Sequence, residues 1–222
     1  MALDPSRCRA RRRCRHARDV APASTVVTVL EAARDAANHL AESTAAIALV
    51  GGLAVSARAE PRNTRDVDFA VAAPGDHEAE LIVRSLVAQG YGIVAVLEQD
   101  RTGRLATVRL RQAGTGAVVV DLLFASSGIE REVAAEAERL EIAPGVALPV
   151  ARTGHLIAMK LLSRDDVTRP QDRVDLASLL LTASEQEIER ATGACKAIDE
   201  RGCARGRDLE LLLREAVATW RR

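Results

Sequence analysis

The chain of 222 residues carries 31 basic and 31 acidic residues, so its formal net charge is zero, and its 48% hydrophobic content can support a buried core. This composition excludes a chain that is disordered throughout, and the lack of an uninterrupted apolar run of roughly 20 residues excludes a membrane-spanning protein. The four cysteines, Cys8, Cys14, Cys195 and Cys203, form neither a CxxC pair nor a disulfide framework, which predicts a reduced, cytoplasmic setting.

The first 18 residues form a basic arm with seven arginines and one acid, Asp4, and therefore a formal charge of +6. Residues 19–222 must then carry −6 in total. We predict that residues 1–22 are a disordered arm. Two interpretations remain open: an electrostatic tether that neutralises nucleic-acid phosphates, or a solvated tail or artefact of the assigned start, without a function.

The first part of the folded chain is predicted to alternate helices and strands. Helical spacing of apolar residues and short apolar runs indicate, in order, a helix, a strand, a helix, a strand and a helix over residues 24–43, 47–50, 53–59, 66–71 and 78–89. Gly51 and Gly52 form the turn between the first strand and the second helix, and Gly90 suits the C-terminal turn of the last helix.

Three strands are predicted next, over residues 93–97, 105–110 and 118–124, followed by a helix around 130–139 and a turn at Pro144 and Gly145. From Gly154 onward the sequence predicts only helices, with Pro170 near a helix start and a capping box at Ser184. The chain is thus expected to divide near residue 150 into a core of residues 23–150 and a C-terminal helical region of residues 151–222 that completes the active site.

Two carboxylates, Asp66 and Asp68, are predicted to share one face of a strand, because side chains at positions i and i+2 point to the same side. Like charges this close repel each other unless a cation lies between them. A divalent metal with oxygen ligands, Mg²⁺ in particular, would supply that charge. The alternative is a solvated strand face at the edge of a sheet.

A third acid, Asp121, stands within an otherwise apolar run, residues 118–124, which predicts a buried central strand. An unpaired carboxylate there would cost several kcal/mol or take up a proton, so Asp121 needs a partner. A metal shared with Asp66 and Asp68 is one candidate partner. Arg109 on the neighbouring predicted strand is the other.

Gly51 and Gly52 stand between a strand and a helix, where glycine lets backbone amides approach a phosphate and the helix N-terminus favours negative charge. A glycine pair alone is a weak signal. The combination of a glycine pair, a helix, a loop and the acids Asp66 and Asp68 is much more specific than its parts.

This combination resembles the polymerase-beta-like nucleotidyltransferase superfamily, whose sites join a glycine turn, a strand with two acids and a third acid on a later strand. The resemblance is carried by residues 49–55, 62–68 and 120–124. Residues 155–162 and 169–176 further resemble the AbiEii type, known as toxins of toxin-antitoxin or phage-defence pairs. The match covers roughly residues 45–180. It implies a polymerase-beta-like core, a mixed α/β (α+β) sheet flanked by helices, followed by helices.

The resemblance also implies further residues of a nucleotide-binding site. They are Lys160 on a C-terminal helix and either Asp172 or Asp175 on the next one, with Arg62 or Arg65 offsetting triphosphate charge. Two departures are evident. Gly52 replaces a frequent serine, so that Ser56 would have to face the site to supply a hydroxyl, and Gln171 replaces a frequent lysine beside Asp172.

Lys160 is one of only two lysines in a chain with 29 arginines. Its apolar neighbours would allow it to extend its side chain to solvent as an ordinary surface residue. A lysine in such an arginine-rich chain instead suggests a compact point charge for a triphosphate oxygen. The second lysine, Lys196, is predicted to be an ordinary residue on a helix surface.

The sequence therefore predicts an enzyme that moves a nucleoside monophosphate from a nucleoside triphosphate (NTP) to an acceptor hydroxyl and releases pyrophosphate. Mg²⁺ or Mn²⁺ would be its cofactor, bound by Asp66, Asp68 and Asp121. The resemblance implies a toxin acting on tRNA and paired with a cognate antitoxin. The alternatives are transfer to a small-molecule or protein hydroxyl, and a non-catalytic binding protein that retains the fold. The acidic folded part and the scarcity of aromatic residues argue against an RNA acceptor.

Overall fold

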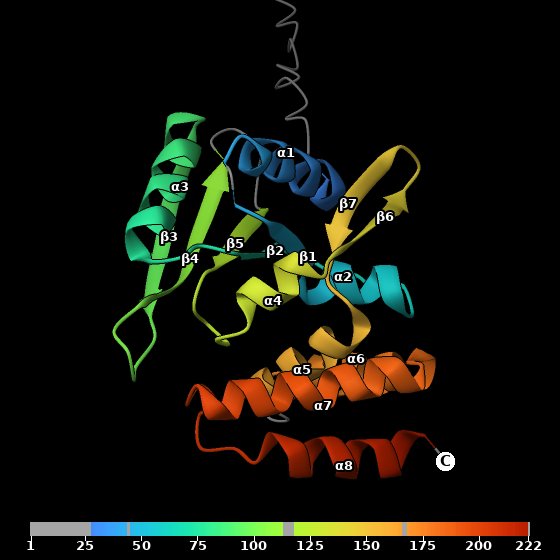
Figure 1. Ribbon diagram of the computed structural model, residues 1–222. Coiled ribbons are helices and arrows are strands. Elements are labelled where there is room, and N and C mark those ends of the chain that lie inside the picture. Colours follow the sequence, from blue (N-terminus) through green and yellow to red (C-terminus); the bar gives the residue numbers. More distant parts are fainter. Residues whose placement is uncertain (1–27, 44, 113–117, 166–167, 222) are drawn as a thin grey trace, which may run out of the picture.

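The computed structural model describes residues 28–43, 45–112, 118–165 and 168–221. The predicted basic arm of residues 1–22 lies outside these ranges, so its two interpretations stay open. The described part contains one mixed sheet with helices on both sides of it (Figure 1), as the predicted α/β (α+β) class requires. No helix in the described ranges combines the length and apolar character needed to cross a membrane.

Seven strands of the described chain form the sheet, in the order β3-β4-β5-β2-β1-β7-β6. β2 pairs with β5 and β1 with β7 in parallel, and the other neighbours are antiparallel. The strands are β1 (Ile47–Val50), β2 (Asp66–Val71), β3 (Tyr91–Glu98), β4 (Leu105–Gln112), β5 (Val119–Leu123), β6 (Glu138–Ala143) and β7 (Val146–Val150).

Four helices accompany the described strands and four follow them, so the described chain is entirely helical in its regular structure beyond Val150. The last four helices lie together on one side of the sheet (Figure 1). The helices are α1 (Val29–Ala41), α2 (Gly51–Arg58), α3 (Asp76–Ala88), α4 (Glu130–Ala135), α5 (Thr153–Ser163), α6 (Pro170–Thr182), α7 (Glu185–Glu200) and α8 (Leu209–Trp220). The division into two domains remains a prediction.

Local sequence signals account for several helix ends. Thr28 and Glu31 form a reciprocal capping box at the start of α1. Ser184 accepts a hydrogen bond from the backbone of Glu187 at the start of α7, as expected from its motif. Pro170 is the first residue of α6, where a missing N–H costs nothing. Gly90 follows α3 with φ +93°, the left-handed conformation that ends many helices.

One predicted helix ends earlier than expected, and the strands that follow it were not predicted. The helix expected around residues 130–139 ends at Ala135, and residues from Glu138 belong to the hairpin β6–β7, which turns at Gly145 with φ +75°. The half-buried strand β6 alternates exposed and less exposed residues. This segment forms strands and not helix because β7 pairs with β1 and β6 pairs with β7, which extends the sheet by two strands. A longer α4 could not make these pairings.

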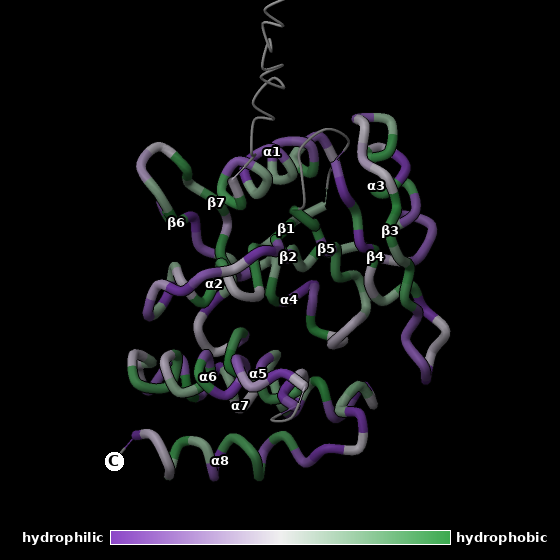
Figure 2. Tube along the Cα trace, turned by 180° about the vertical axis from the view of Figure 1, so that it is seen from behind, coloured by the Kyte–Doolittle hydropathy of each residue, from purple (hydrophilic) through white to green (hydrophobic). Residues whose placement is uncertain are grey.

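The apolar side chains of the sheet and the helices form one continuous core. The central strands β1 and β5 are strongly hydrophobic, whereas α1 and α8 alternate between hydrophobic and hydrophilic residues (Figure 2). Phe69 of β2 and Leu122 of β5 are fully buried neighbours in the register of the sheet. Burial of the intervening residues Val67 and Phe69 leaves Asp66 and Asp68 on the opposite face of β2.

A buried histidine is expected to make stability depend on pH. His155 lies in the first turn of α5, its Nδ1 has no partner among the described residues, and burial lowers its pKa. Because the unfolded chain then binds this proton more readily, the free energy of unfolding must fall as pH drops below about 6.5. Thermal unfolding at pH 7.5 and pH 5.5 measures the effect. The unfolding midpoint of His155→Leu should fall less between pH 7.5 and pH 5.5 than that of the wild type. Replacement of the exposed His77 should leave the fall unchanged. Equal falls in all three proteins would contradict the assignment to His155.

Candidate active site

Three polar side chains occupy one row across the central strands of the sheet. Asp68 of β2 is the register partner of Asp121 on β5, and Asp121 is the partner of Arg109 on β4. Asp66 precedes Asp68 by two residues and therefore shares its face. The parallel pairing of β2 with β5, which sequence alone does not establish, brings the three acids together.

Asp121 is buried, with a relative accessibility of 7%, and forms a bidentate ion pair with Arg109. The guanidinium Nε donates to Oδ1 at 2.9 Å and Nη2 donates to Oδ2 at 2.7 Å. Of the two partners that the sequence left open, the structure thus provides Arg109. The pair fixes the orientation of Asp121 beside Asp68 and offsets its burial.

Asp68 lacks such a partner. No hydrogen bond or ion pair to its carboxylate occurs within the described ranges, and burial followed by the charge of Asp121 raises its pKa to about 7. The charges of Lys160 and Arg169 oppose this rise without cancelling it. A partly buried carboxylate beside two other acids is therefore in an environment that favours a bound cation.

The donors at this position suit a hard divalent cation. Within the part of the chain that the structure describes, no three His, Cys, Asp or Glu side chains are arranged to hold a metal by themselves. Arg109 uses one lone pair on each oxygen of Asp121, so Asp66 and Asp68 are the two acids of this cluster without an ion-pair partner within the described ranges, and a metal role of Asp121 stays a prediction. Mg²⁺ commonly binds one or two carboxylates and completes its coordination with substrate phosphates, so this pair fits it.

The glycine pair begins α2 directly beside these acids. Gly51 has φ +64°, and a Cβ atom added to it would lie 1.9 Å from Oδ2 of Asp68. A Cβ atom on Gly52 would lie 2.5 Å from Nη2 of Arg62 and 2.8 Å from Oγ1 of Thr64. Gly51 therefore requires glycine for its backbone conformation as well as for space, whereas a side chain at Gly52 would displace the end of Arg62 and the hydroxyl of Thr64. Both glycines also leave the amides at the start of α2 accessible to an anion.

Substitution of Gly51 by alanine is expected to displace Asp68 and to destabilise the protein by about 2 kcal/mol or more, because the change adds both a clash and a strained φ. Thermal unfolding measures this effect, and titration with Mg²⁺ should give a weaker response than the wild type. Gly193→Ala is the matched control. Gly193 lies inside α7 with open space around it, so alanine there should stabilise by about 0.5–1 kcal/mol. Equal midpoints for the two variants would contradict this reading.

Lys160 is buried and bridges two carboxylates of α6. Its Nζ lies 2.7 Å from Oδ1 of Asp172 and 2.7 Å from Oδ2 of Asp175. Both aspartates contact Lys160, and the role of either one in binding a nucleotide stays a prediction. Burial opposes ionisation of Asp175, but the contacts with Lys160, Gln171 and Arg62 outweigh it and lower its pKa.

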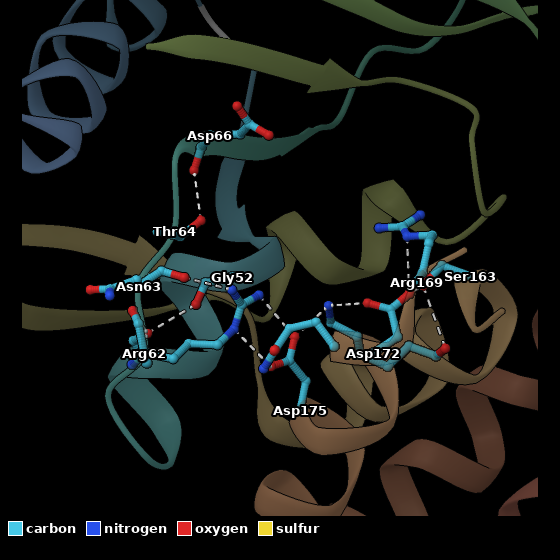
Figure 3. A network of polar contacts seen from close by, with 12 residues as sticks. Gly52, Arg62, Asn63, Thr64, Asp66, Ser163, Arg169, Asp172 and Asp175 are labelled. Atoms are coloured by element: carbon cyan, nitrogen blue, oxygen red, sulfur yellow. Dashed lines mark hydrogen bonds and ion pairs between the residues drawn. The ribbon is translucent and has the colours of Figure 1, made fainter. Parts of the chain in front are cut away.

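Each of the two aspartates has further partners, and they connect the helices to the site (Figure 3). Arg62 donates from Nη2 to Oδ2 of Asp175 at 2.9 Å. Ser163, the last residue of α5, donates to Oδ2 of Asp172 at 3.0 Å, and Nε of Arg169 lies 3.2 Å from the same oxygen. The network therefore ties the loop before β2 to both helices.

Ser56 has other contacts than the expected phosphate contact. Its hydroxyl donates to the carbonyl oxygen of Gly52 at 3.1 Å and accepts from the backbone N–H of Arg62 at 3.2 Å. It does not line the cavity described below. Ser56 thus fixes the loop that carries Arg62, and its direct role in binding a nucleotide stays a prediction.

Most of these groups line one cavity of about 730 Å³. The lining includes both predicted glycines, four of the five predicted acids and all three predicted cations. These residues are Gly51, Gly52, Arg62, Arg65, Asp66, Asp68, Asp121, Lys160 and Asp172. Asp175 lies behind this lining and supports Lys160 and Arg62.

Sequence reasoning missed several residues of this wall. Arg169, Ser163 and Thr64 line the cavity, as do Asn63 and Arg205. Asn63, Thr64 and Arg169 lie inside the stretches 62–68 and 169–176 that carry the resemblance, so only their individual roles were missed. The described lining contains six basic side chains against four carboxylates, and it is thus more basic than the acidic folded part as a whole.

Comparison with known proteins gives a family match. The profile of the family described as "Nucleotidyl transferase AbiEii toxin, Type IV TA system" matches residues 35–219. No curated protein sequence matches the chain.

Solved structures resemble the fold. An antigenic nucleotidyltransferase-like protein from Paracoccidioides brasiliensis is 17% identical, with a TM-score of 0.50, over 86% of this chain and 92% of that one. The antibiotic-resistance factor ANT(2'')-Ia is 19% identical, with a TM-score of 0.43, over 83% and 90%. JHP933 from Helicobacter pylori is 15% identical, with a TM-score of 0.42, over 85% and 87%. The first of these likenesses shows that the predicted fold is correct.

Proposed function

This chain belongs to the AbiEii nucleotidyltransferase family, and from that premise we propose that it is an Mg²⁺-dependent enzyme that transfers a nucleoside monophosphate from a nucleoside triphosphate to an acceptor hydroxyl. The acceptor in this proposal is a tRNA. The observation that supports this proposal is the cavity in which Gly51, Asp66, Asp68, Asp121 and Lys160 meet. It combines donors for a cation, amides for a phosphate and a buried ammonium group in one place.

Each group has a distinct task in the proposed reaction. Asp66 and Asp68 hold Mg²⁺ (or Mn²⁺), which when bound stabilises charge on the reacting phosphate oxygens. Gly51 and Gly52 admit the triphosphate to the start of α2. Lys160 stands at the same wall, held by α6, and offsets triphosphate charge.

Asp121 faces the acceptor in this proposal. The acceptor oxygen forms a bond to the α-phosphorus, and the bond from that phosphorus to the bridging oxygen breaks. Pyrophosphate leaves with the electron pair, and the acceptor proton passes to Asp121. The Arg109 contact holds Asp121 in place until the acceptor arrives.

The excess of basic side chains around the cavity favours an RNA acceptor, despite the acidic folded part. As in the family description, we propose a toxin role, with a cognate antitoxin that prevents growth arrest. Induced expression should therefore arrest bacterial growth, and Asp68→Asn should abolish the arrest. Growth arrest by both proteins would count against a catalytic toxin.

The direct test incubates the purified chain with each common ribonucleoside triphosphate, labelled at the α-phosphate, and with total RNA. We expect label in the tRNA fraction, release of pyrophosphate, and loss of both on addition of EDTA. Label in protein or in a small-molecule extract would assign one of the other acceptors. Failure of every triphosphate to release pyrophosphate with any of these acceptors would remove the enzymatic proposal.

A further inference from the structure

The connection between α7 and α8 is anchored to the sheet-bearing part of the molecule. Arg201 contacts the carbonyl oxygen of Gly128, and its Nη1 donates to Glu132 at 3.0 Å. Cys203 is buried against Gly128, where an added Cβ would lie 2.8 Å from the cysteine sulfur. These contacts fix a loop of the C-terminal helices against the segment that follows β5.

This anchored connection presents Arg205 to the cavity. Arg205 lines the cavity, and its Nη2 donates to the carbonyl oxygen of Ser126 at 3.1 Å. Its Nε and Nη1 have no hydrogen-bond or ion-pair partner within the described ranges. The backbone of Arg205 has φ +55°, a strained conformation found at no other described non-glycine residue. Such strain persists when surrounding contacts hold it, and it is concentrated at functional sites.

The order of the strands places Arg205 at the opposite side of the acids from the glycine turn. β2 lies between β1 and β5 in the sheet, so Gly51 follows the strand on one side of Asp68 and Ser126 follows the strand on the other. Because the triphosphate is proposed to bind at Gly51, the wall near Ser126 and Asp121 is the side open to the acceptor.

The chemistry of this wall is cationic and hydroxylic. Besides Arg205 it contains Arg109, Thr107, Ser126 and the aliphatic Leu97. The carboxylate on this side, Asp121, is already paired with Arg109. A cationic acceptor would meet two guanidinium groups here, whereas a phosphate would gain charge-assisted hydrogen bonds.

Resting on the proposed nucleotidyl transfer, we propose that Arg205 binds the acceptor through a phosphate group that lies near the reacting hydroxyl. The acceptor is therefore a phosphate-bearing alcohol, either a phosphodiester chain such as RNA or a small phosphate monoester. The C-terminal helices thus contribute a residue that selects the acceptor, in addition to Lys160 and Asp172 on the nucleotide side.

Arg205→Gly removes the guanidinium without a steric penalty at positive φ, so the variant should unfold within about 3 °C of the wild type. Arg207→Ala is the matched control, because Arg207 lies on the same connection and lines a different cavity, together with Asp199 and Asp208. The probes are total tRNA and glycerol 3-phosphate, each titrated by calorimetry onto the full chain with EDTA present.

We expect Arg205→Gly to weaken the binding of one probe about 10- to 100-fold. Arg207→Ala should bind the same probe with an affinity within about twofold of the wild type. Weaker binding of tRNA identifies the phosphodiester as the ligand. The slope of log affinity against log salt concentration should then fall by about one, the value for one lost phosphate contact. Weaker binding of glycerol 3-phosphate identifies the phosphate monoester as the ligand. The inference is overturned if the wild type binds neither probe, or if Arg205→Gly binds both as tightly as the wild type. Because these titrations contain no NTP, they are independent of whether transfer itself is observed.

Discussion

Asparagine in place of Asp66 or Asp68 is expected to reduce nucleotidyl transfer by about 10³-fold or more while the protein stays folded. Each change removes one of the two carboxylates of the cluster that have no ion-pair partner within the described ranges, whereas Asp121 is paired with Arg109. Asparagine keeps the size of the side chain and deletes its charge. The loss therefore concerns cation binding and not packing.

Two measurements separate this explanation from misfolding. Steady-state release of pyrophosphate measures the loss of rate. Thermal unfolding with and without MgCl₂ measures cation binding, because Mg²⁺ should raise the unfolding midpoint of the wild type and leave those of the variants unchanged. In EDTA at pH 8, Asp68→Asn should unfold no earlier than the wild type. The pKa of Asp68 is raised to about 7, so the folded state is destabilised as pH rises from about 4 to 7, and asparagine removes that cost.

Asp76→Asn provides the control for these variants. Asp76 lies at the start of α3, partly exposed and paired with Arg104, away from the cavity. Its replacement should leave both transfer and the Mg²⁺ response unchanged. Transfer by Asp68→Asn within about tenfold of the wild type would show that these carboxylates do not bind the catalytic cation.

Methionine in place of Lys160 should both destabilise the protein and abolish transfer. The change leaves Asp172 and Asp175 buried with one cation fewer, and breaking a buried ion pair in this way costs about 3 kcal/mol or more. For a chain of this length, that cost corresponds to a fall of about 6–12 °C in the unfolding midpoint. Thermal unfolding and pyrophosphate release measure the two effects.

A second variant separates stability from catalysis. Combining Lys160→Met with Asp175→Asn removes one of the two buried carboxylates that lose Lys160, so the unfolding midpoint should recover in part while transfer stays absent. Lys196→Met is the control, because Lys196 is exposed on α7 and its pair with Glu200 is worth little. A Lys160→Met protein as stable and active as Lys196→Met would refute the proposed role.

Much of the candidate site was predictable from local patterns. Period-two alternation placed Asp66 and Asp68 on one face of a strand, and the glycine pair marked the start of α2. The rarity of lysine drew attention to Lys160, which is buried between two carboxylates. These features depend on neighbouring residues and on composition, which a sequence displays directly.

Contacts between distant segments were not predictable in the same way. The strands of the hairpin β6–β7 were not predicted, and the first two residues of β6 were assigned to a helix. The pairing of the hairpin with β1 joins residues about 100 positions apart, Leu49 and Val150. The sequence left the partner of Asp121 open, and the register of β4 and β5 selects Arg109. Arg205 belongs to none of the recognised motifs.

The sequence by itself therefore determined the chemical class of this protein: paired carboxylates, a glycine turn and a conspicuous lysine at spacings that suit phosphate chemistry. Only the tertiary structure decided which charges neutralise one another and which remain free for a ligand. The physical reason is that a charge pair forms through distance and burial, and both are properties of chain segments brought together by folding. Asp172 and Asp175 with Lys160, Asp121 with Arg109 and the unpartnered Asp68 are the result.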